Sequence, residues 1–439
     1  MRDDNTAGRG GGPAPVVMVD VYAPTLRLAR AFQEAGHPVV RVQSTPSVPP
    51  VYRGSFRTEE FADDIVDDGD FASTLRAVAA HRPVAVLTGG ELGVELADRL
   101  AEALGLAGNG TRLSAARRHK HTQIETIKAA GLPGTRQHLA ASAEDAAAWH
   151  RELGGRAVVK PVRSAGNDHV SFCASPEETA AAYEKIMAAT NIFSFRNEGV
   201  VVQEHLEGTE YVVNTVSRDG QHRCTDVWRY MKISANGVTD RISAAVSTHP
   251  GSPERARLIE YGFEVLDALE VRHGPAHLEI MLTPDGPRLV EAGIRLCGAD
   301  AAYFARLAAG ESQIERTVDA YLRPERFLAS VGDAHRVERH VAMAYLTSPV
   351  SGTLAGYPLL PQVEALESFH NVHIAVPEGG RLPLTVDDTT EPMMIGLAHT
   401  SEHVLARDLN TVHYLDGAGF YALADLADLA DLADLGGGA

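Results

Sequence analysis

The chain has 439 residues, which at about 150 residues per domain suggests about three domains, each large enough to bury a core. Hydrophobic residues make up 44% and charged residues 22%, the balance of an ordinary globular protein rather than a disordered or fibrous one. The 40 Lys and Arg against 58 Asp and Glu give a net charge of −18, which disfavours general binding to nucleic acid or to anionic membranes.

The sequence shows neither a membrane span nor a secretory signal. No apolar run reaches the length of about 18 residues that a span needs, and residues 1–15 are polar and Gly-rich. We therefore expect a cytoplasmic protein, and a homodimer stays open. The three cysteines, Cys173, Cys224 and Cys297, are too scattered for a disulfide framework or a Cys-based zinc site. Cys297 has no His or Asn arrangement around it that indicates a catalytic thiol, so we interpret it as a packing residue.

The first region, residues 15–110, alternates predicted strands and helices. In chain order these are a strand at 16–22, a helix at 24–36, strands at 38–43 and 83–88, and a helix at 91–104. This alternation predicts a doubly wound parallel sheet, an α/β arrangement. The Gly89-Gly90 turn after the last strand lacks the G-x-G-x-x-G pattern and a matching acid, so NAD binding is not expected.

The second region, residues 111–325, begins after a Gly-rich joint and a predicted helix at 115–130. Longer alternating segments follow and predict an α+β body rich in antiparallel strands. The predicted strands are 157–161, 169–173, 199–205, 209–218, 223–234, 241–248, 275–283 and 286–292, with helices at 176–189 and 252–269.

The third region, residues 326–421, has short predicted strands such as 340–347 and 371–376, which predict a small β-rich cap. Residues 422–439 form a low-complexity tail of Leu-Ala-Asp repeats. A period of three gives no stable apolar stripe on a helix, so we expect a frayed or disordered tail.

Lysine is scarce, since only five of the 40 basic residues are Lys: Lys120, Lys128, Lys160, Lys185 and Lys232. Lys160 ends a predicted buried strand and precedes a loop of small and polar residues, Arg163 to Asp168. Such a loop can bring backbone N–H groups close to phosphate oxygens, although it does not match the Walker pattern and alone also fits an ordinary hairpin.

A second motif runs from Gln203 through Glu204 and Leu206 to Glu210. A strand end that turns into another strand leaves backbone groups free to read an adenine edge, and Glu210 can accept from ribose hydroxyls. A hairpin with solvated acids is the alternative interpretation.

Glu279 and Glu291 stand on two strands joined by a short turn, each between apolar neighbours. Two half-buried carboxylates repel each other unless a cation neutralises them, and Mg²⁺ takes carboxylate and phosphate oxygens together. Two separately satisfied structural acids are the alternative. Arg295, four residues after Glu291 and between glycines, suggests a guanidinium directed at a carboxylate or phosphoryl group, with a plain Arg–Glu surface pair as the alternative.

In this order the motifs resemble the ATP-grasp superfamily, particularly its carboxylate–amine ligases of the L-amino acid ligase type. The resemblance extends from about residue 16 to about 415. It implies an N-terminal Rossmann-like parallel-sheet domain, a central ATP-grasp body and a small β-rich C-terminal domain.

The resemblance also implies roles for the candidate residues. Lys120 and Lys160 would contact the phosphates of ATP, under a flexible loop that includes Ser164, Ala165 and Gly166. Gln203, Glu204 and Leu206 would line the adenine, and Glu210 would hold the ribose. Glu279 and Glu291 would bind Mg²⁺, or Mn²⁺ in its place, and Arg295 would stabilise an acyl phosphate.

The sequence departs from part of the superfamily at Gly293, where D-Ala–D-Ala ligases and others carry a metal-binding Asn. That difference weakens a D-Ala ligase assignment and suits the amino acid ligase subgroup. His249 stands where that subgroup often places a His near the amino acid, with a solvated or structural His as the alternative. Lys232 is an unplaced candidate that also fits a strand-edge Lys.

We therefore expect an ATP-dependent ligase with small-molecule substrates, an amino acid or related carboxylate and an amine. It forms an amide, dipeptide-like bond through an acyl phosphate, in natural product biosynthesis. Two alternatives stay open. One is an ATP-grasp enzyme that activates bicarbonate or acts on a nucleotide precursor. The other, of a different class, is a nucleotide-binding regulatory protein without turnover.

Overall fold

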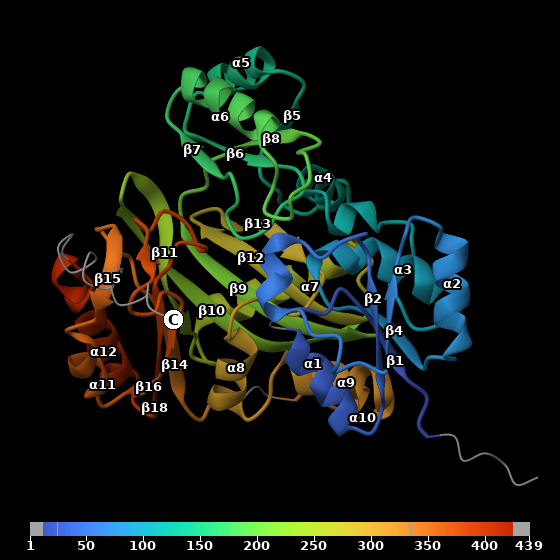
Figure 1. The fold of residues 1–439 in the computed structure, drawn as a ribbon. Helices are drawn as coiled ribbons and strands as arrows, with labels where there is room; N and C mark the ends of the chain where they lie inside the picture. The colour runs from blue at the N-terminus through green and yellow to red at the C-terminus, as the bar shows by residue number, and fades with distance from the viewer. Residues whose placement is uncertain (1–11, 24, 334–335, 425–439) are drawn as a thin grey trace, which may run out of the picture.

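The computed structural model describes residues 12–23, 25–333 and 336–424. Its strands form an N-terminal parallel sheet, a small antiparallel sheet that stands above the rest of the molecule, and a long sheet across the middle (Figure 1). A smaller three-stranded sheet lies near the C-terminal end of the described chain. The mixed α/β and α+β fold predicted from the sequence is confirmed.

The N-terminal sheet has four strands in the order β3-β2-β1-β4, all parallel. Val16–Val19 of β1 is completely buried between helices, which explains its unbroken apolar sequence. Strand β3 escaped prediction because its sequence, DDIV, is half exposed at the sheet edge. The elements are β1 (Val16–Val19), α1 (Leu26–Glu34), β2 (Val39–Gln43), η1 (Pro50–Ser55), β3 (Asp63–Val66), α2 (Phe71–Ala80), β4 (Ala85–Thr88), η2 (Glu91–Gly93) and α3 (Val94–Ala103).

The helix predicted at 115–130 is shorter and is preceded by a separate turn. Residues Ala115–Arg117 form the 3₁₀ turn η3, and α4 (Lys120–Ala129) begins only after His119. The His119 side chain accepts a hydrogen bond from the Thr122 N–H and so caps the helix start. Lys120 is thereby the first residue of the helix.

The small antiparallel sheet has the strand order β5-β8-β6-β7 and two helices on one face (Figure 1). Its helices pack through Ala146, Ala182 and Ile186 onto the strands. Its elements are β5 (Gln137–Ala140), α5 (Ala143–Leu153), β6 (Ala157–Pro161), β7 (Ser171–Cys173), α6 (Pro176–Ala188) and β8 (Val200–Glu204).

The long sheet has eight strands in the order β13-β12-β9-β10-β11-β14-β18-β16. Strands β14, β18 and β16 come from the region that the sequence assigned to a separate cap, yet they extend the same sheet. The strands are β9 (Thr209–Arg218), β10 (Gln221–Ala235), β11 (Val238–Ser247), β12 (Gly274–Thr283), β13 (Gly286–Gly293), β14 (His340–Tyr345), β16 (Phe369–Ile374) and β18 (Met393–His399).

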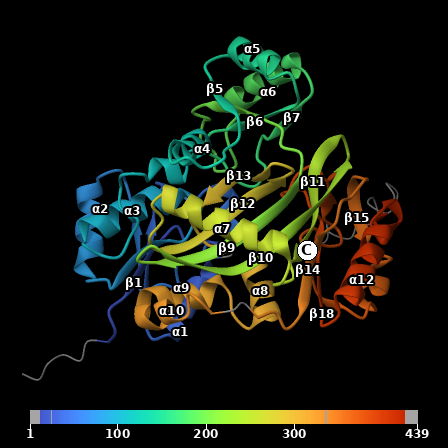
Figure 2. The ribbon, with the colours of Figure 1, turned by 180° about the vertical axis from the view of Figure 1, so that it is seen from behind.

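Helix α7 (Pro253–Ala268) crosses one face of the long sheet, as Figure 2 shows from behind. Its residues Leu258, Val265 and Leu266 are buried against Val213 and Leu278 of the sheet. Helices α8 (Ala301–Ala309), α9 (Gln313–Leu322) and α10 (Pro324–Ala329) follow the sheet strand β13. Alternate residues within the strands of the long sheet, such as Glu210, Lys232 and Glu279, line the cavity described below, so part of one sheet face is available for a site.

The C-terminal elements pack around a second core that includes Leu354, Leu405 and Phe420. The expected tail begins later than predicted, because Ala422–Leu423 form β19 and pair with β15. The remaining repeats, residues 425–439, lie outside the described residues. The further elements are β15 (Gly352–Gly356), α11 (Leu360–Glu364), β17 (Arg381–Leu382), α12 (Glu402–Leu415) and η4 (Ala418–Phe420).

Within the described ranges, no helix combines the length and the apolar character that crossing a bilayer requires.

Candidate active site

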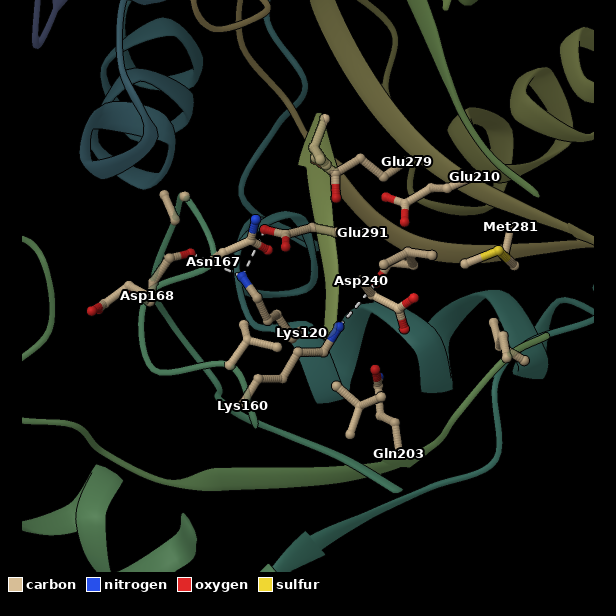
Figure 3. A pocket seen from close by; sticks show the side chains of 18 of the residues that line it. Lys120, Lys160, Asn167, Asp168, Gln203, Glu210, Asp240, Glu279, Met281 and Glu291 are labelled. Atoms are coloured by element: carbon tan, nitrogen blue, oxygen red, sulfur yellow. Dashed lines mark hydrogen bonds and ion pairs between the residues drawn. The ribbon is translucent and has the colours of Figure 1, made fainter. Parts of the chain in front are cut away.

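A cavity of about 180 Å³ lies between the small antiparallel sheet and the end of the long sheet. Its lining comes from segments far apart in the chain, from α4 to the loop after β17. Among the residues proposed from the sequence, it brings together Lys120, Lys160, Ser164, Ala165, Gly166, Gln203, Glu204, Leu206, Glu210, Glu279, Glu291 and Arg295. Figure 3 shows the labelled carboxylates Glu210, Glu279 and Glu291 across the cavity from Lys160 and Gln203.

Glu279 and Glu291 are direct partners in the antiparallel ladder of β12 and β13. The two strands share a short turn, so the register places both carboxylates on one face. Burial acts to raise the pKa of Glu279. A hydrogen bond from His277 and the positive charges of Lys120 and Arg295 act more strongly and lower that pKa to about 2. Glu279 is therefore a carboxylate, not a neutral acid.

Lys120 and Lys160 reach these carboxylates from two different elements, α4 and β6. Lys120 Nζ lies 2.7 Å from Glu291 Oε1 and donates to the Ser164 carbonyl oxygen at 2.9 Å. Lys160, at the end of β6, has its Nζ 3.4 Å from the Val290 carbonyl oxygen. Burial lowers the pKa of Lys160 to about 8, against the attraction of Glu291. Both ammonium groups thus border the same small volume as the paired acids.

The carboxylate pair fits a hard divalent cation. Among the described residues, no group of three or more His, Cys, Asp and Glu is arranged to hold a metal. A cation at Glu279 and Glu291 therefore needs further oxygens from a phosphate and water, as Mg²⁺ commonly has. Gly293 offers no ligand, and a Cβ built there would lie 3.2 Å from the Arg295 guanidinium carbon. Glycine at this position lets Arg295 fold back beside the carboxylate pair.

The loop after Lys160 is held in a defined shape. Gly166 and Asn167 both have a positive φ, 66° and 57°, which turns the backbone sharply. The Asp168 carboxylate accepts from the Ser164 hydroxyl at 2.5 Å and from the Ile192 N–H at 2.8 Å. These bonds keep Ser164 and Gly166 at the cavity wall.

The segment from Gln203 to Glu210, called the hinge below, places Glu210 beside Lys232. No position for Lys232 could be predicted from the sequence. Lys232 Nζ lies 2.5 Å from Glu210 Oε2, and both residues line the cavity. Burial acts to lower the pKa of Lys232, and the charge of Glu210 raises it overall. Burial raises the pKa of Glu210, and the charge of Lys232 acts to lower it. Glu210 is thereby a fixed acceptor in a buried position. Gln203 donates to Gln137 Oε1 at 2.9 Å, which orients its amide in the floor of the cavity.

Arg295 meets an acid that the sequence analysis missed. Its Nε lies 3.1 Å from Glu91 Oε2, and Glu91 comes from η2 at the carboxyl end of the parallel sheet. The sequence feature that could have pointed to Glu91 is its position directly after the Gly89-Gly90 turn. Bonding to Glu91 and to the Leu296 carbonyl oxygen fixes the guanidinium at the edge of the cavity.

A hydrogen-bonded chain behind Glu279 was also missed. His277 Nε2 lies 3.4 Å from Glu279 Oε1, and its Nδ1 lies 2.8 Å from Asn214 Oδ1. Asn214 in turn donates to the buried Asp226, which also accepts from the Trp228 indole N–H at 2.6 Å. The alternation of His277 and Glu279 on one strand was visible in the sequence, but their partner Asn214 was not.

His249 does not line this cavity. It follows the end of β11 opposite to Asp240 and Ile242, which do line it. The His249 ring stacks against His340, with ring centroids 6.2 Å apart, and its Nδ1 accepts from the Gly251 N–H. This placement gives no support to a catalytic role for His249 at the cavity.

Residues 155–302 match the family described as the ATP-grasp domain. The chain is 32% identical over 354 residues to dapdiamide A synthase of Enterobacter agglomerans, an alignment that covers 78% of this chain and 82% of that protein. It is 23% identical over 195 residues to the L-arginine-specific L-amino acid ligase of Bacillus subtilis, covering 44% of this chain and 47% of that protein.

Solved structures share the whole fold. The L-amino acid ligase from Bacillus licheniformis superimposes with a TM-score of 0.73 at 17% identity, covering 94% of this chain and 100% of that one. N5-carboxyaminoimidazole ribonucleotide synthetase from Thermotoga maritima gives a TM-score of 0.64 at 15% identity, covering 92% and 98%. The fold is thus shared with solved enzymes whose names give different reactions.

Proposed function

The chain belongs to the ATP-grasp family, and from this premise we propose which residues of its cavity bind the nucleotide, the metal and the substrates. It is an ATP-dependent carboxylate–amine ligase. ATP-grasp enzymes use ATP and Mg²⁺, and solved relatives include a complex with MgADP. The observation that carries the proposal is the convergence of two lysines, two paired glutamates and Arg295 in one cavity.

We place the adenine at the hinge formed by Gln203, Glu204 and Leu206. The Glu204 N–H donates to the Arg136 carbonyl oxygen at 2.9 Å, which fixes the backbone at this residue. In the proposed arrangement the Glu204 carbonyl oxygen accepts from the adenine amino group. The ribose hydroxyls then lie at Glu210, whose carboxylate is held in place by Lys232. This order along the cavity puts the phosphates near the two lysines.

We place the phosphates between Lys120, Lys160 and the loop that contains Ser164, Ala165 and Gly166. Two buried ammonium groups can neutralise phosphate oxygens there, and the turned backbone offers N–H groups. Glu279 and Glu291 are the residues that would hold Mg²⁺. When bound, the metal would supply positive charge to the transferring phosphoryl group.

In the reaction we propose, an oxygen of the substrate carboxylate attacks the γ-phosphorus, the bond to the bridging oxygen of ADP breaks, and an acyl phosphate forms. Lys120, Lys160 and Arg295 stabilise the negative charge that spreads over the moving group. A neutral amine then attacks the acyl carbon, the carbon–oxygen bond to phosphate breaks, and the nitrogen loses a proton. The products are an amide, ADP and inorganic phosphate.

We further propose that both substrates are small amino acids or related compounds, so that the product is dipeptide-like. The resemblance to dapdiamide A synthase over 78% of the chain supports this substrate class. The net charge of −18 supports free small molecules rather than nucleic acid or an anionic membrane.

The test is phosphate release from Mg-ATP in the presence of pooled amino acids, with products read by mass. We expect release that depends on the pool and a product equal to two substrates minus water. Release that follows bicarbonate instead of the pool would contradict the proposal. Release no greater than that of the Glu291→Gln variant would also contradict it.

A further inference from the structure

A second cavity, of about 360 Å³, lies at the carboxyl ends of the strands in the parallel sheet. Ser44 and Thr45 follow β2, Asp67 follows β3, and Leu92 follows β4. In open α/β sheets, this edge is where ligands bind. The opposite wall comes from the segment 191–198, between α6 and β8. The cavity therefore has the position of a ligand site but no role in the ATP-binding arrangement.

Positive charge in this cavity exceeds what its acids neutralise. It is lined by Arg99, Arg118, Arg163 and Arg196. Arg163 pairs with both nearby glutamates, Glu95 at 2.9 Å and Glu198 at 3.7 Å. In the part of the chain that the structure describes, Arg99 and Arg196 have no ion-pair partner within 4.0 Å. An anionic ligand would supply the missing partner.

Arg118 carries the most specific part of the argument. Its side chain is 9% exposed, and its buried Nε has no hydrogen-bond partner among the described residues. Its nearest carboxylate oxygen, Glu91 Oε1, is 3.8 Å away, while Glu91 Oε2 binds Arg295. A buried guanidinium N–H without an acceptor is costly, so the guanidinium of Arg118, which lines the cavity, is suited to donate hydrogen bonds to an external carboxylate.

The same acid, Glu91, therefore lies between the second cavity and Arg295 of the first. Tyr52 lies in the same place, since its ring packs against Phe193 of the second cavity with ring centroids 5.9 Å apart. Burial raises the pKa of its hydroxyl, and the charges of Arg295, Glu91 and Arg118 act on that pKa as well. A ligand bound at Arg118 is thus adjacent to the place where we locate the acyl phosphate.

We propose that the second cavity binds the amine substrate of the ligase, and that this substrate is an α-amino acid whose carboxylate binds Arg118. The inference rests on the proposed function, because it assigns the second half-reaction to this place. The amino group would lie toward Glu91, and Phe193, Phe195 and Leu96 would contact the side chain. The neutral amine attacks the acyl carbon, phosphate leaves with the acyl oxygen, and the nitrogen releases its proton.

The wall of this cavity is also tied to the phosphate-binding loop. The Asn191 amide donates to the Arg163 carbonyl oxygen at 3.2 Å, and the Ile192 N–H donates to Asp168. Asp168 in turn holds Ser164. A ligand against Phe193 therefore contacts the segment that keeps the phosphate loop in place.

The experiment compares each accepted amine substrate with its primary amide. An amino acid amide has no free carboxylate, so it can react only as the amine, and its product identifies that role by mass. For the wild type we expect a preference for the free acid of at least about tenfold in kcat/KM, the value of one charge-assisted hydrogen bond. Arg118→Gln should bring this preference close to one by raising the KM of the free acid.

Arg196→Gln, at an exposed position of the same cavity, should reduce the preference by a smaller factor of about three, as expected for a partly screened charge. If a thermal melt shows that Arg118→Gln is not folded, the acid-to-amide preference of Arg196→Gln is the measurement that tests the proposal. Arg151→Gln on the exposed side of α5 is the matched control and should keep the wild-type preference.

The proposal is overturned if the wild type uses acid and amide equally. It is also overturned if Arg118→Gln, or in its place Arg196→Gln, changes only the KM of the carboxylate donor, since the cavity would then hold the other substrate. Failure of the ligase function itself looks different, because the wild type would then form no ATP-dependent product with any pair.

Discussion

Lys120 and Glu291 are 171 residues apart in the sequence, yet Lys120 Nζ lies 2.7 Å from Glu291 Oε1. The same ammonium binds the carbonyl oxygen of Ser164 in the phosphate loop. Helix α4, β13 and this loop therefore meet at one buried charge. If a phosphate oxygen takes the place of Glu291 at Lys120, the carboxylate becomes free to bind a metal, so nucleotide and metal binding are expected to be coupled.

The first prediction concerns that carboxylate. Glu291→Gln keeps the shape and an acceptor for Lys120 but removes one of the paired negative charges. We expect phosphate release from Mg-ATP to fall by at least about a hundredfold, since loss of a buried charge partner costs several kcal/mol and each 1.4 kcal/mol is a factor of ten. Glu264→Gln on the exposed side of α7 is the control and should keep wild-type release. A folded Glu291→Gln variant with substantial turnover would contradict the metal-binding role.

The second prediction uses the scarcity of lysine. Lys160 is 4% exposed, so the larger planar guanidinium of Lys160→Arg cannot occupy the same volume beside Val290 without moving the wall. We expect the steady-state rate to fall at least about tenfold. Lys185→Arg on the surface of α6 should have no effect. Equal rates for the two variants would mean that Lys160 is only a basic residue retained by chance.

The sequence was sufficient to predict the fold class, because its features are local. The apolar run Val16–Val19 and the strand–helix alternation identified the parallel sheet. The short turn between β12 and β13 predicts antiparallel pairing with Glu279 and Glu291 near each other on one face, and the two are direct partners in the ladder. In each case the interacting residues are close in the chain or follow a strand period.

Contacts between distant segments could not be predicted in this way. Glu91 reaches Arg295 across 204 residues, and Asn214 reaches His277 through the pairing of β9 with β12. Their partners depend on how sheets pack and on strand register, which a single sequence does not specify. His249 is a different case. The resemblance to the family suggested it as a site residue, but it follows the far end of β11, stacks on His340 and does not line the cavity.

The third prediction concerns the chain of hydrogen bonds behind Glu279. Asn214→Leu has a similar volume but removes the acceptor of His277 Nδ1, so His277 is no longer fixed toward Glu279. We expect the Mg²⁺ concentration for half-maximal phosphate release to rise about 10–100-fold, as for other partners of metal ligands.

Nucleotide binding in EDTA separates this effect from general damage, because the hinge at Gln203 and Leu206 does not contact Asn214. We expect the affinity measured without metal to stay within about twofold of wild type, since the substituted residue lies away from the adenine-binding segment. An unchanged Mg²⁺ requirement in the folded variant would show that His277 does not position Glu279.

The last prediction concerns pH and Glu391, which lies 2.9 Å from an Arg241 nitrogen. Burial, together with the nearby charge of Asp388, raises the pKa of Glu391 to about 8 despite the attraction of Arg241. Between its ordinary value of 4.5 and about 8, the folded protein binds a proton at Glu391 that the unfolded chain does not. The stabilisation from this group is therefore complete below pH 4.5 and is lost as the pH rises to about 8.

Glu391→Gln removes this titration but keeps a neutral polar side chain beside Arg241, as in the protonated wild type. Thermal melts from pH 5 to 9 should show a smaller decline of the melting temperature for the variant, because titrating groups that do not interact with Glu391 contribute equally to both proteins. Glu364→Gln at an exposed position of α11 should follow the wild-type curve. Parallel curves for wild type and Glu391→Gln would mean that the folded protein ionises Glu391 at its ordinary pKa, with Arg241 outweighing the cost of burial.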